Sequence, residues 1–268
     1  MTQHGSGLKA LLWDVDGTLA ETERDGHLPA FNQAFEAGGL DWRWTSAQYG
    51  ALLRTTGGRE RILHDMVAQR RGPALAAERE ALARQLHCVK NLRYAQIVEG
   101  AGLPWRAGVH ALLLECRENG VRLAIVTTTS RVNVQALLRA LLGQDWAQWF
   151  AVLVCGEDVT RKKPDPEAYQ RALRELRISP LEALAIEDSP GGAAAARAAE
   201  VPVVVARSSY FVDAVFERVT AIGPGLHTRQ GWRPPLPTPP DKAGDDGRVS
   251  LADLMHWHAT MDIVSDHR

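Results

Sequence analysis

Cysteine is scarce in this chain, and long apolar runs are missing from it. Only three cysteines occur among 268 residues, Cys88, Cys116 and Cys155, and their spacing suggests no pairing. An odd, scattered set of cysteines predicts a reducing compartment rather than a disulfide framework. No run approaches the ~18 apolar residues of a transmembrane helix, and the N-terminus lacks the charged-then-apolar pattern of a signal peptide. We therefore expect a soluble cytoplasmic protein without a membrane partner.

The chain also lacks an excess of charge of either sign. Lysine and arginine total 31, aspartate and glutamate total 32, and the sequence pI is near 6.8. General binders of nucleic acid or of anionic membranes carry a basic surplus, so we expect neither as a partner. Hydrophobic residues make up 45% of the chain, enough to bury a core in one large domain or in a core with a smaller domain.

Two carboxylates directly follow the first apolar run. Residues 8–13 have the length of a buried strand, and Asp14-Val15-Asp16-Gly17-Thr18 comes immediately after them. In open α/β sheets, ligands bind at the carboxyl edge. At that edge Asp14 is suited to attack phosphorus, and Asp16 to protonate the leaving oxygen and later to activate water. An Asp–Gly turn with incidental acids is the plain alternative, but the complete motif favours phosphoryl transfer.

A long helical stretch follows this motif. From about residue 25 to 98 the sequence is rich in helix formers, with breaks at Gly38-Gly39, Gly57-Gly58 and Arg71-Gly72-Pro73. No strand pattern interrupts it. We predict a separate helical cap domain at 25–98, inserted after the first strand and placed to cover the carboxyl edge of the sheet.

The remainder of the chain alternates between strand-like and helical segments. Short apolar runs at 122–126, 151–154, 184–186 and 201–205 are separated by helices of about ten residues. This alternation is typical of parallel βαβ units. We predict an α/β core with a doubly wound parallel sheet, formed by residues 1–24 and 99–268.

Three of the later strand ends also carry polar signatures. Thr127-Thr128-Thr129-Ser130 follows one strand, Lys162-Lys163-Pro164-Asp165-Pro166 follows the next, and Glu187-Asp188-Ser189 follows the one after. Thr127 and Lys163 are suited to bind and neutralise a phosphoryl group, whereas paired acids suit a hard cation such as Mg²⁺. Taken alone, each signature could be a helix cap or a solvated loop. Their recurrence at successive strand ends favours one composite site.

The order of these motifs resembles motifs I to IV of the haloacid dehalogenase (HAD) superfamily, over roughly residues 8–206. The resemblance implies a Rossmann-like parallel sheet with the first strand at its centre and a helical cap inserted after motif I. It also implies a role for each matching residue: Asp14 as nucleophile and metal ligand, Asp16 as general acid/base whose main-chain carbonyl binds Mg²⁺, Thr127 as phosphate-binding hydroxyl, Lys163 as the motif III lysine, and Asp188 as a metal ligand with Glu187 beside it.

A closer resemblance, to the CbbY-type phosphatases, lies in the predicted cap. It is carried by Glu21-Thr22-Glu23, His27, Ala30-Phe31-Asn32, Leu40-Asp41-Trp42 and residues 55–61. That family hydrolyses xylulose-1,5-bisphosphate and is associated with Rubisco and carbon fixation. Two features depart from the bacterial pattern: more residues separate Glu23 from His27, and Arg59 replaces a common lysine, which keeps the charge but not its geometry.

The resemblance implies a Mg²⁺-dependent phosphatase that removes one phosphate from xylulose-1,5-bisphosphate, a sugar phosphate that inhibits Rubisco. We expect a distal phosphate to bind at Gly58, Arg59 and Arg61, where a helix start and two guanidinium groups meet. Glu23 and His27 are expected to bind sugar hydroxyls, and Thr128 to contact substrate. We expect a monomer with a functional link to Rubisco but no stable complex with it.

Three alternatives remain open. A β-phosphoglucomutase-like phosphomutase shares the second aspartate, so Asp16 does not separate it from a phosphatase. A broad-range phosphatase of sugar monophosphates would share all the core motifs. A non-enzymatic scaffold would use the proline-rich stretch at 234–240 to recruit a partner, although that stretch is also typical of a semi-rigid surface connection. Retention of Asp14, Asp16, Lys163 and Asp188 together argues against the scaffold.

Overall fold

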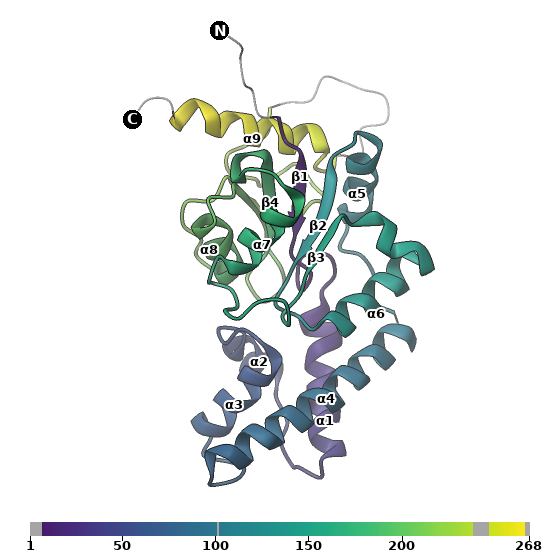
Figure 1. Ribbon diagram of the computed structural model, residues 1–268, viewed down its shortest axis with the longest axis vertical. Coiled ribbons are helices and arrows are strands. Elements are labelled where there is room, and N and C mark those ends of the chain that lie inside the picture. The colour runs from purple at the N-terminus through teal and green to yellow at the C-terminus, as the bar shows by residue number, and fades with distance from the viewer. Residues whose placement is uncertain (1–6, 101, 238–246, 266–268) are drawn as a thin grey trace.

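A single parallel sheet forms the centre of the α/β core. The computed structural model describes residues 7–100, 102–237 and 247–265 (Figure 1). Its 6-stranded sheet has the order β3-β2-β1-β4-β5-β6, and all neighbouring strands are parallel. The predicted doubly wound sheet with the first strand at its centre is therefore confirmed. The strands are β1 (Ala10–Trp13), β2 (Arg122–Val126), β3 (Val152–Val154), β4 (Ala183–Glu187), β5 (Val203–Ala206) and β6 (Ala221–Gly223).

Helices cover both faces of this sheet (Figure 1). Successive residues of β1 point to opposite sides, so Leu11 and Trp13 join one apolar cluster while Ala10 and Leu12 join the other. Both faces of β1 are fully buried, as expected of a central parallel strand. The first cluster includes α5 (Val109–Glu118), α6 (Arg131–Leu142) and α9 (Leu251–Ser265), and the second includes α7 (Glu167–Leu176) and α8 (Pro190–Ala198).

The helical segment inserted after β1 has an apolar core of its own. Figure 1 shows it at the end of the core where the chain leaves β1. Its buried aromatic residues pack together, with the ring centroids of Phe31 and Trp44 4.8 Å apart and those of Phe35 and Trp44 also 4.8 Å apart. Its elements are η1 (Glu23–His27), α1 (Leu28–Ala37), α2 (Ser46–Leu52), α3 (Gly58–Ala68) and α4 (Ala76–Gly100). Helical structure therefore extends two residues beyond the predicted limits of 25 and 98 at each end.

The C-terminal part of the chain packs on the core. Helix α9 begins after Ser250, whose main-chain N–H donates to Asp253 Oδ2 at 3.0 Å. Leu254 and Trp257 are buried, and Trp257 lies 4.8 Å from the ring of Trp232. The side chain of Met261 in the same helix is outside the described part of the structure, as are residues 238–240 of the proline-rich stretch. None of the helices in the described part of the chain combines the length and apolarity needed to span a bilayer.

Candidate active site

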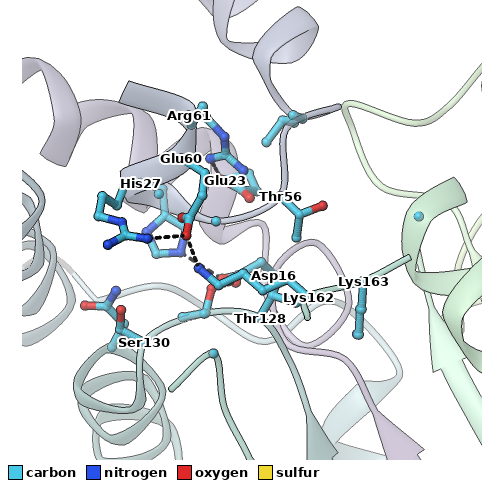
Figure 2. A pocket seen from close by; sticks show the side chains of 18 of the residues that line it. Asp16, Glu23, His27, Thr56, Glu60, Arg61, Thr128, Ser130, Lys162 and Lys163 are labelled. Carbon is cyan, nitrogen blue, oxygen red and sulfur yellow. Dashed lines mark hydrogen bonds and ion pairs between the residues drawn. The ribbon is translucent and has the colours of Figure 1, made fainter. Parts of the chain in front are cut away.

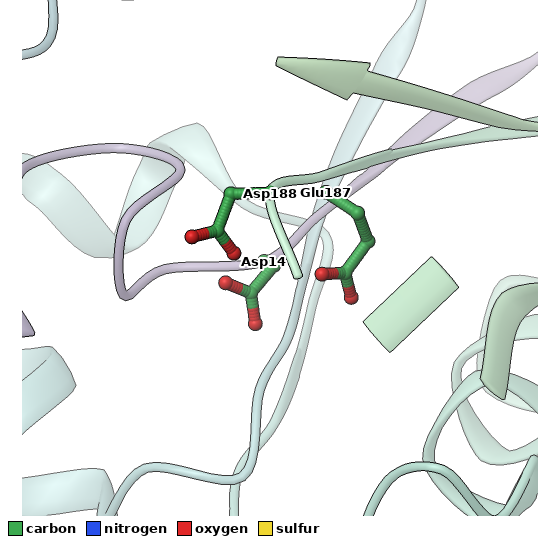
Figure 3. A group of neighbouring side chains, drawn as sticks. All are labelled: Asp14, Glu187 and Asp188. Atoms are coloured by element: carbon green, nitrogen blue, oxygen red, sulfur yellow. The ribbon is translucent and has the colours of Figure 1, made fainter. Parts of the chain in front are cut away.

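Three buried carboxylates meet at the carboxyl edge of the sheet. Trp13 pairs with Ile186 across β1 and β4, so the next residues, Asp14 and Glu187, emerge side by side. One carboxylate oxygen from each of Asp14, Glu187 and Asp188 lies within 4.8 Å of the others (Figure 3). The parallel register of two central strands is thus sufficient to gather the three acids.

One buried lysine, Lys163, donates hydrogen bonds to two carboxylates of this acidic group. Lys163 Nζ donates to Asp14 Oδ1 at 2.8 Å, to Glu187 Oε1 at 2.6 Å and to the Val126 carbonyl at 2.7 Å. Tyr169 OH also donates to Glu187 Oε1, at 2.6 Å. Burial lowers the pKa of Lys163, but the charges of Asp14 and Glu187 outweigh it and hold that pKa above its usual value. Lys163 therefore stays cationic and ties the first strand end to the fourth.

The acidic group has the composition of a divalent-cation site. Three carboxylates face one ammonium, and burial, reinforced by their mutual repulsion, raises the pKa of both Asp14 and Asp188. Glu187 Oε2 is buried without a hydrogen-bond partner among the described residues. Gly17 approaches so closely that a Cβ there would lie 2.1 Å from Asp188 Oδ2. The surplus of negative charge and the oxygen donors fit a hard cation such as Mg²⁺.

Asp16 lies beside this group and is contacted by three polar side chains, two from the segment at η1 and one from the turn after β2. Thr22 Oγ1 donates to Asp16 Oδ1 at 2.6 Å, Thr129 Oγ1 donates to Oδ2, and His27 Nε2 lies 2.9 Å from Oδ1. Burial raises the pKa of Asp16, but His27 and the two hydroxyls outweigh it, so that pKa lies below its usual range. Asp16 is ionised in this arrangement and ready to accept a proton.

A π turn brings His27 to Asp16. Element η1 is a five-residue π-helix in which the N–H of Leu28 donates to the carbonyl of Glu23. A π turn contains one residue more than an α turn. It therefore absorbs extra chain length between Glu23 and His27, the departure from the CbbY-type pattern noted in the sequence. The His27 ring is also fixed by stacking on Tyr94, at 4.2 Å between centroids.

A cavity of about 720 Å³ opens above these residues, between the sheet edge and the helical segment (Figure 2). Thr127 and Glu187 are buried beside it, and Thr127 Oγ1 accepts a hydrogen bond from the N–H of Thr129 at 3.2 Å. The other predicted site residues line the cavity: Asp14, Asp16, Glu23, His27, Gly58, Arg59, Arg61, Thr128, Lys163 and Asp188.

The two predicted phosphate-binding arginines occupy different surroundings. Arg59 is half-exposed, with 42% of its side chain accessible, and pairs with Glu80 at 2.9 Å and Glu60 at 3.2 Å. Arg61 is buried, and its Nη1 donates to Tyr49 OH at 2.6 Å; that hydroxyl in turn donates to Glu23. Arg59 can therefore turn toward a ligand at low cost, whereas Arg61 is part of a buried network.

Several residues of the site were not anticipated from the sequence. Thr22 and Thr129 contact Asp16, and Tyr49 joins Glu23 to Arg61. Lys90 of α4 lines the cavity, and its Nζ lies 5.2 Å from each of the Phe31 and Tyr94 ring centroids. Burial lowers its pKa to about 7. Lys90 lies on the buried stripe of α4 with Ala83, Leu86 and Tyr94, a position that the structure shows and the sequence did not reveal.

Comparison with known proteins assigns this architecture to a family. The model of the haloacid dehalogenase-like hydrolases matches residues 8–200. Protein CbbY of Cupriavidus necator is 39% identical over 252 residues, which cover 94% of this chain and 97% of that protein. The chain belongs to the CbbY group of the haloacid dehalogenase-like hydrolases.

Two further members of the CbbY group support this assignment. Protein CbbY of Rhodobacter capsulatus is 44% identical over 203 residues, 76% of this chain and 87% of that protein. The crystal structure of a CbbY variant from Rhodobacter sphaeroides in complex with xylulose-1,5-bisphosphate has a TM-score of 0.74, with 39% identity, and covers 79% of this chain and 92% of that chain. The chain is therefore an enzyme, a phosphatase of the HAD type.

Proposed function

We propose that the enzyme removes one phosphate from xylulose-1,5-bisphosphate to give xylulose-5-phosphate, through an aspartyl-phosphate on Asp14. The proposal is carried by one observation: Asp14, Asp16 and Lys163 line one wall of a cavity whose opposite wall presents Arg59 and a helix start. A bisphosphate needs two anion sites, and these walls supply them. The complex reported for the R. sphaeroides protein supports the choice of sugar.

In the first half-reaction, a carboxylate oxygen of Asp14 attacks phosphorus while the bond from phosphorus to the sugar oxygen breaks. Asp16, which carries the proton that it took from water in the preceding turnover, gives that proton to the sugar oxygen and is left as the carboxylate that His27 contacts at 2.9 Å. Lys163, 2.8 Å from Asp14, balances charge on the phosphoryl group as it transfers. Thr127, which is buried, and Thr128, which is partly exposed, directly follow β2 at this edge of the sheet.

In the second half-reaction, Asp16 takes a proton from water, and the water oxygen attacks the phosphorus of the aspartyl-phosphate. The bond between phosphorus and Asp14 breaks, which releases phosphate and restores the carboxylate. Asp14, Asp188 and the main-chain carbonyl of Asp16 would hold Mg²⁺, with Glu187 behind them. When bound, that cation offsets the repulsion between carboxylates and phosphate.

The distal phosphate is proposed to bind at the first turn of α3. Gly57 precedes this 11-residue helix and caps it with no side chain, so the first main-chain N–H groups have no partner within the helix. Arg59 adds a guanidinium group that only surface carboxylates now engage. Glu23 is expected to contact the sugar, whereas Arg61 orients Glu23 through Tyr49. We further propose a monomeric, cytoplasmic enzyme that serves Rubisco without a stable complex.

The test compares two substrates in Arg59→Ala. We expect KM for xylulose-1,5-bisphosphate to rise at least ~10-fold, which corresponds to about 1.4 kcal/mol, and KM for a small aryl phosphate to stay near its wild-type value. Arg93→Ala is the matched control, since Arg93 lies partly exposed on α4 and pairs with Gln96. Equal losses on both substrates would contradict the proposed distal site.

Two further measurements test the reaction type. Chelation should abolish phosphate release, and added Mg²⁺ should restore it. With β-glucose 1-phosphate, a phosphomutase would yield glucose 6-phosphate, whereas the proposed enzyme yields at most inorganic phosphate. Formation of the 6-phosphate isomer would favour the phosphomutase alternative.

A further inference from the structure

Arg106 lies behind the catalytic edge, where the chain returns from α4 to the core. Its side chain is only 12% exposed. Its guanidinium group donates to three main-chain carbonyls: Nη1 to those of Gly17 and Ala206, the latter at 2.9 Å, and Nη2 to that of Arg207. The N–H of Arg106 also donates to the Leu19 carbonyl at 2.8 Å. No side chain of the acidic group takes part in these contacts.

The carbonyls bound by Arg106 belong to the two loops that flank Asp188. Gly17 lies against one side of it, so closely that no side chain fits between them. Ser208, buried directly after Arg207, lies beside Asp188, because its Cβ and Asp188 Oδ2 both lie against the same face of Gly17. The same guanidinium therefore joins the loop after β1 to the loop after β5, and Asp188 is held in the space between them.

Arg106 also connects the two segments that lead into and out of the helical insertion. Its Nε lies 3.3 Å from Glu21 Oε1, just before η1. The second oxygen of Glu21 accepts a hydrogen bond from Ser209 Oγ at 2.7 Å. Arg106 thus holds both connecting segments, the one before and the one after the helical insertion, close to the acidic group.

We propose that Arg106 is a positioning residue that sets the spacing of the metal site by clamping the Gly17 and Ala206–Arg207 carbonyls on either side of Asp188. This inference rests on the proposed metal-dependent phosphatase activity. A planar guanidinium can bind several carbonyls in a fixed fork, which the single ammonium of a lysine cannot reproduce. Residues that orient metal ligands from behind typically contribute ~10–100-fold to metal affinity.

The experiment measures Mg²⁺ binding to the full chain by calorimetry, without substrate, in wild type and Arg106→Lys. We expect the Kd for Mg²⁺ to rise ~10-fold or more in Arg106→Lys. Phosphate release should fall at low Mg²⁺ and recover toward the wild-type value when the metal is saturating. A merely structural role would not produce this rescue by metal.

Arg122→Lys is the matched control, because Arg122 Nη1 likewise donates to a main-chain carbonyl, that of Leu176 at 2.9 Å, at the opposite edge of the sheet. Its Kd for Mg²⁺ should equal that of wild type. Ser208→Ala, a small change that is compatible with folding, should weaken Mg²⁺ binding from the other side of Asp188. The losses of Mg²⁺ affinity in Ser208→Ala and Arg106→Lys should be non-additive in the double variant.

An unchanged Kd in Arg106→Lys, or equal losses in Arg106→Lys and Arg122→Lys, would overturn the proposal. Additive effects of Arg106→Lys and Ser208→Ala would also overturn it, as would a wild-type chain that binds no Mg²⁺. A chain that binds Mg²⁺ but hydrolyses no phosphate ester would contradict the proposed function alone, since the calorimetric comparison still decides the role of Arg106.

Discussion

The α/β core and the helical segment build their sides of the cavity in different ways. On the core side, Asp14, Glu187 and Asp188 lie at the ends of two paired strands, so the sheet register brings them together. On the helical side, the buried contact between Glu23, Tyr49 and Arg61 joins three separate elements through side-chain packing. A regular sheet fixes its polar groups from the backbone, whereas the helical wall depends on how whole helices pack.

The largest expected effect is on the core side, in Asp14→Asn. The amide keeps the shape but removes the attacking charge, so we expect kcat to fall by ~10⁴ or more. Because Asn also removes a buried negative charge, the metal-free Tm should be at least that of wild type. Steady-state phosphate release and thermal unfolding measure the two effects.

Asp145→Asn, in the exposed η2 (Gln144–Trp149), is the control and should change neither quantity. Near-normal turnover in Asp14→Asn would show that this strand end is not where phosphorus is attacked. A lowered Tm would show that the carboxylate, rather than its neutral form, stabilises the core.

A smaller effect is expected on the helical side, in Lys90→Met. Burial lowers the pKa of Lys90 to about 7 from 10.5, so between these values the unfolded chain binds one more proton than the folded chain. The free energy of unfolding of wild type should therefore rise with pH, by about 2 kcal/mol from pH 7 to 9 through this residue. Lys90→Met should lack that increment in urea unfolding at the two pH values.

Lys162→Met is the matched control, because the Lys162 side chain is 26% exposed and should leave the pH slope in place. Parallel pH profiles for wild type and Lys90→Met would mean that Lys90 is charged in the folded chain at pH 9. The helical wall would then present a permanent cation to the cavity, as the core does with Lys163.

The smallest expected effect is on the free energy of unfolding, from an ion pair at the place where the two regions meet. Lys162 Nζ lies 2.9 Å from Glu60 Oε1, an ion pair that crosses from the core to α3. Both side chains are about one-third exposed or less, so their coupling in a double-mutant cycle of Glu60→Gln and Lys162→Met should be below ~1 kcal/mol. A coupling well above that value in urea unfolding would show that the two walls form one cooperative unit.

Most strands of the sheet could be predicted from the sequence, and there is a physical reason why one strand was missed. Strands β1 to β5 could be located because each is an apolar run that ends in polar residues. β6 was missed because Ala221–Gly223 is only three residues long and ends in glycine, so it carries no periodic pattern. Its place is set instead by pairing with β5 and by the Trp232 ring, which lies against Gly223.

Within the site, the motif residues could be named from the sequence but their contacts could not. The hydroxyl cluster after β2 was recognised from the sequence, and Thr127 in it stays predicted to bind phosphate, but the contact of Thr129 with Asp16 was not foreseen because it depends on the conformation of the turn at 127–130. Lys90 was indistinguishable by composition from the other charged residues of α4. Only the packing of α4 against α1 shows that it is buried.

The π turn at Glu23–His27 affects how the spacing between Glu23 and His27 should be interpreted. A one-residue insertion in an α-helical turn would rotate every later side chain by about 100°, since the helix has 3.6 residues per turn. Here the turn is a π turn, which contains one residue more than an α turn, and His27 meets Asp16. A longer spacing between Glu23 and His27 is therefore compatible with this contact, and the spacing by itself does not indicate a different substrate.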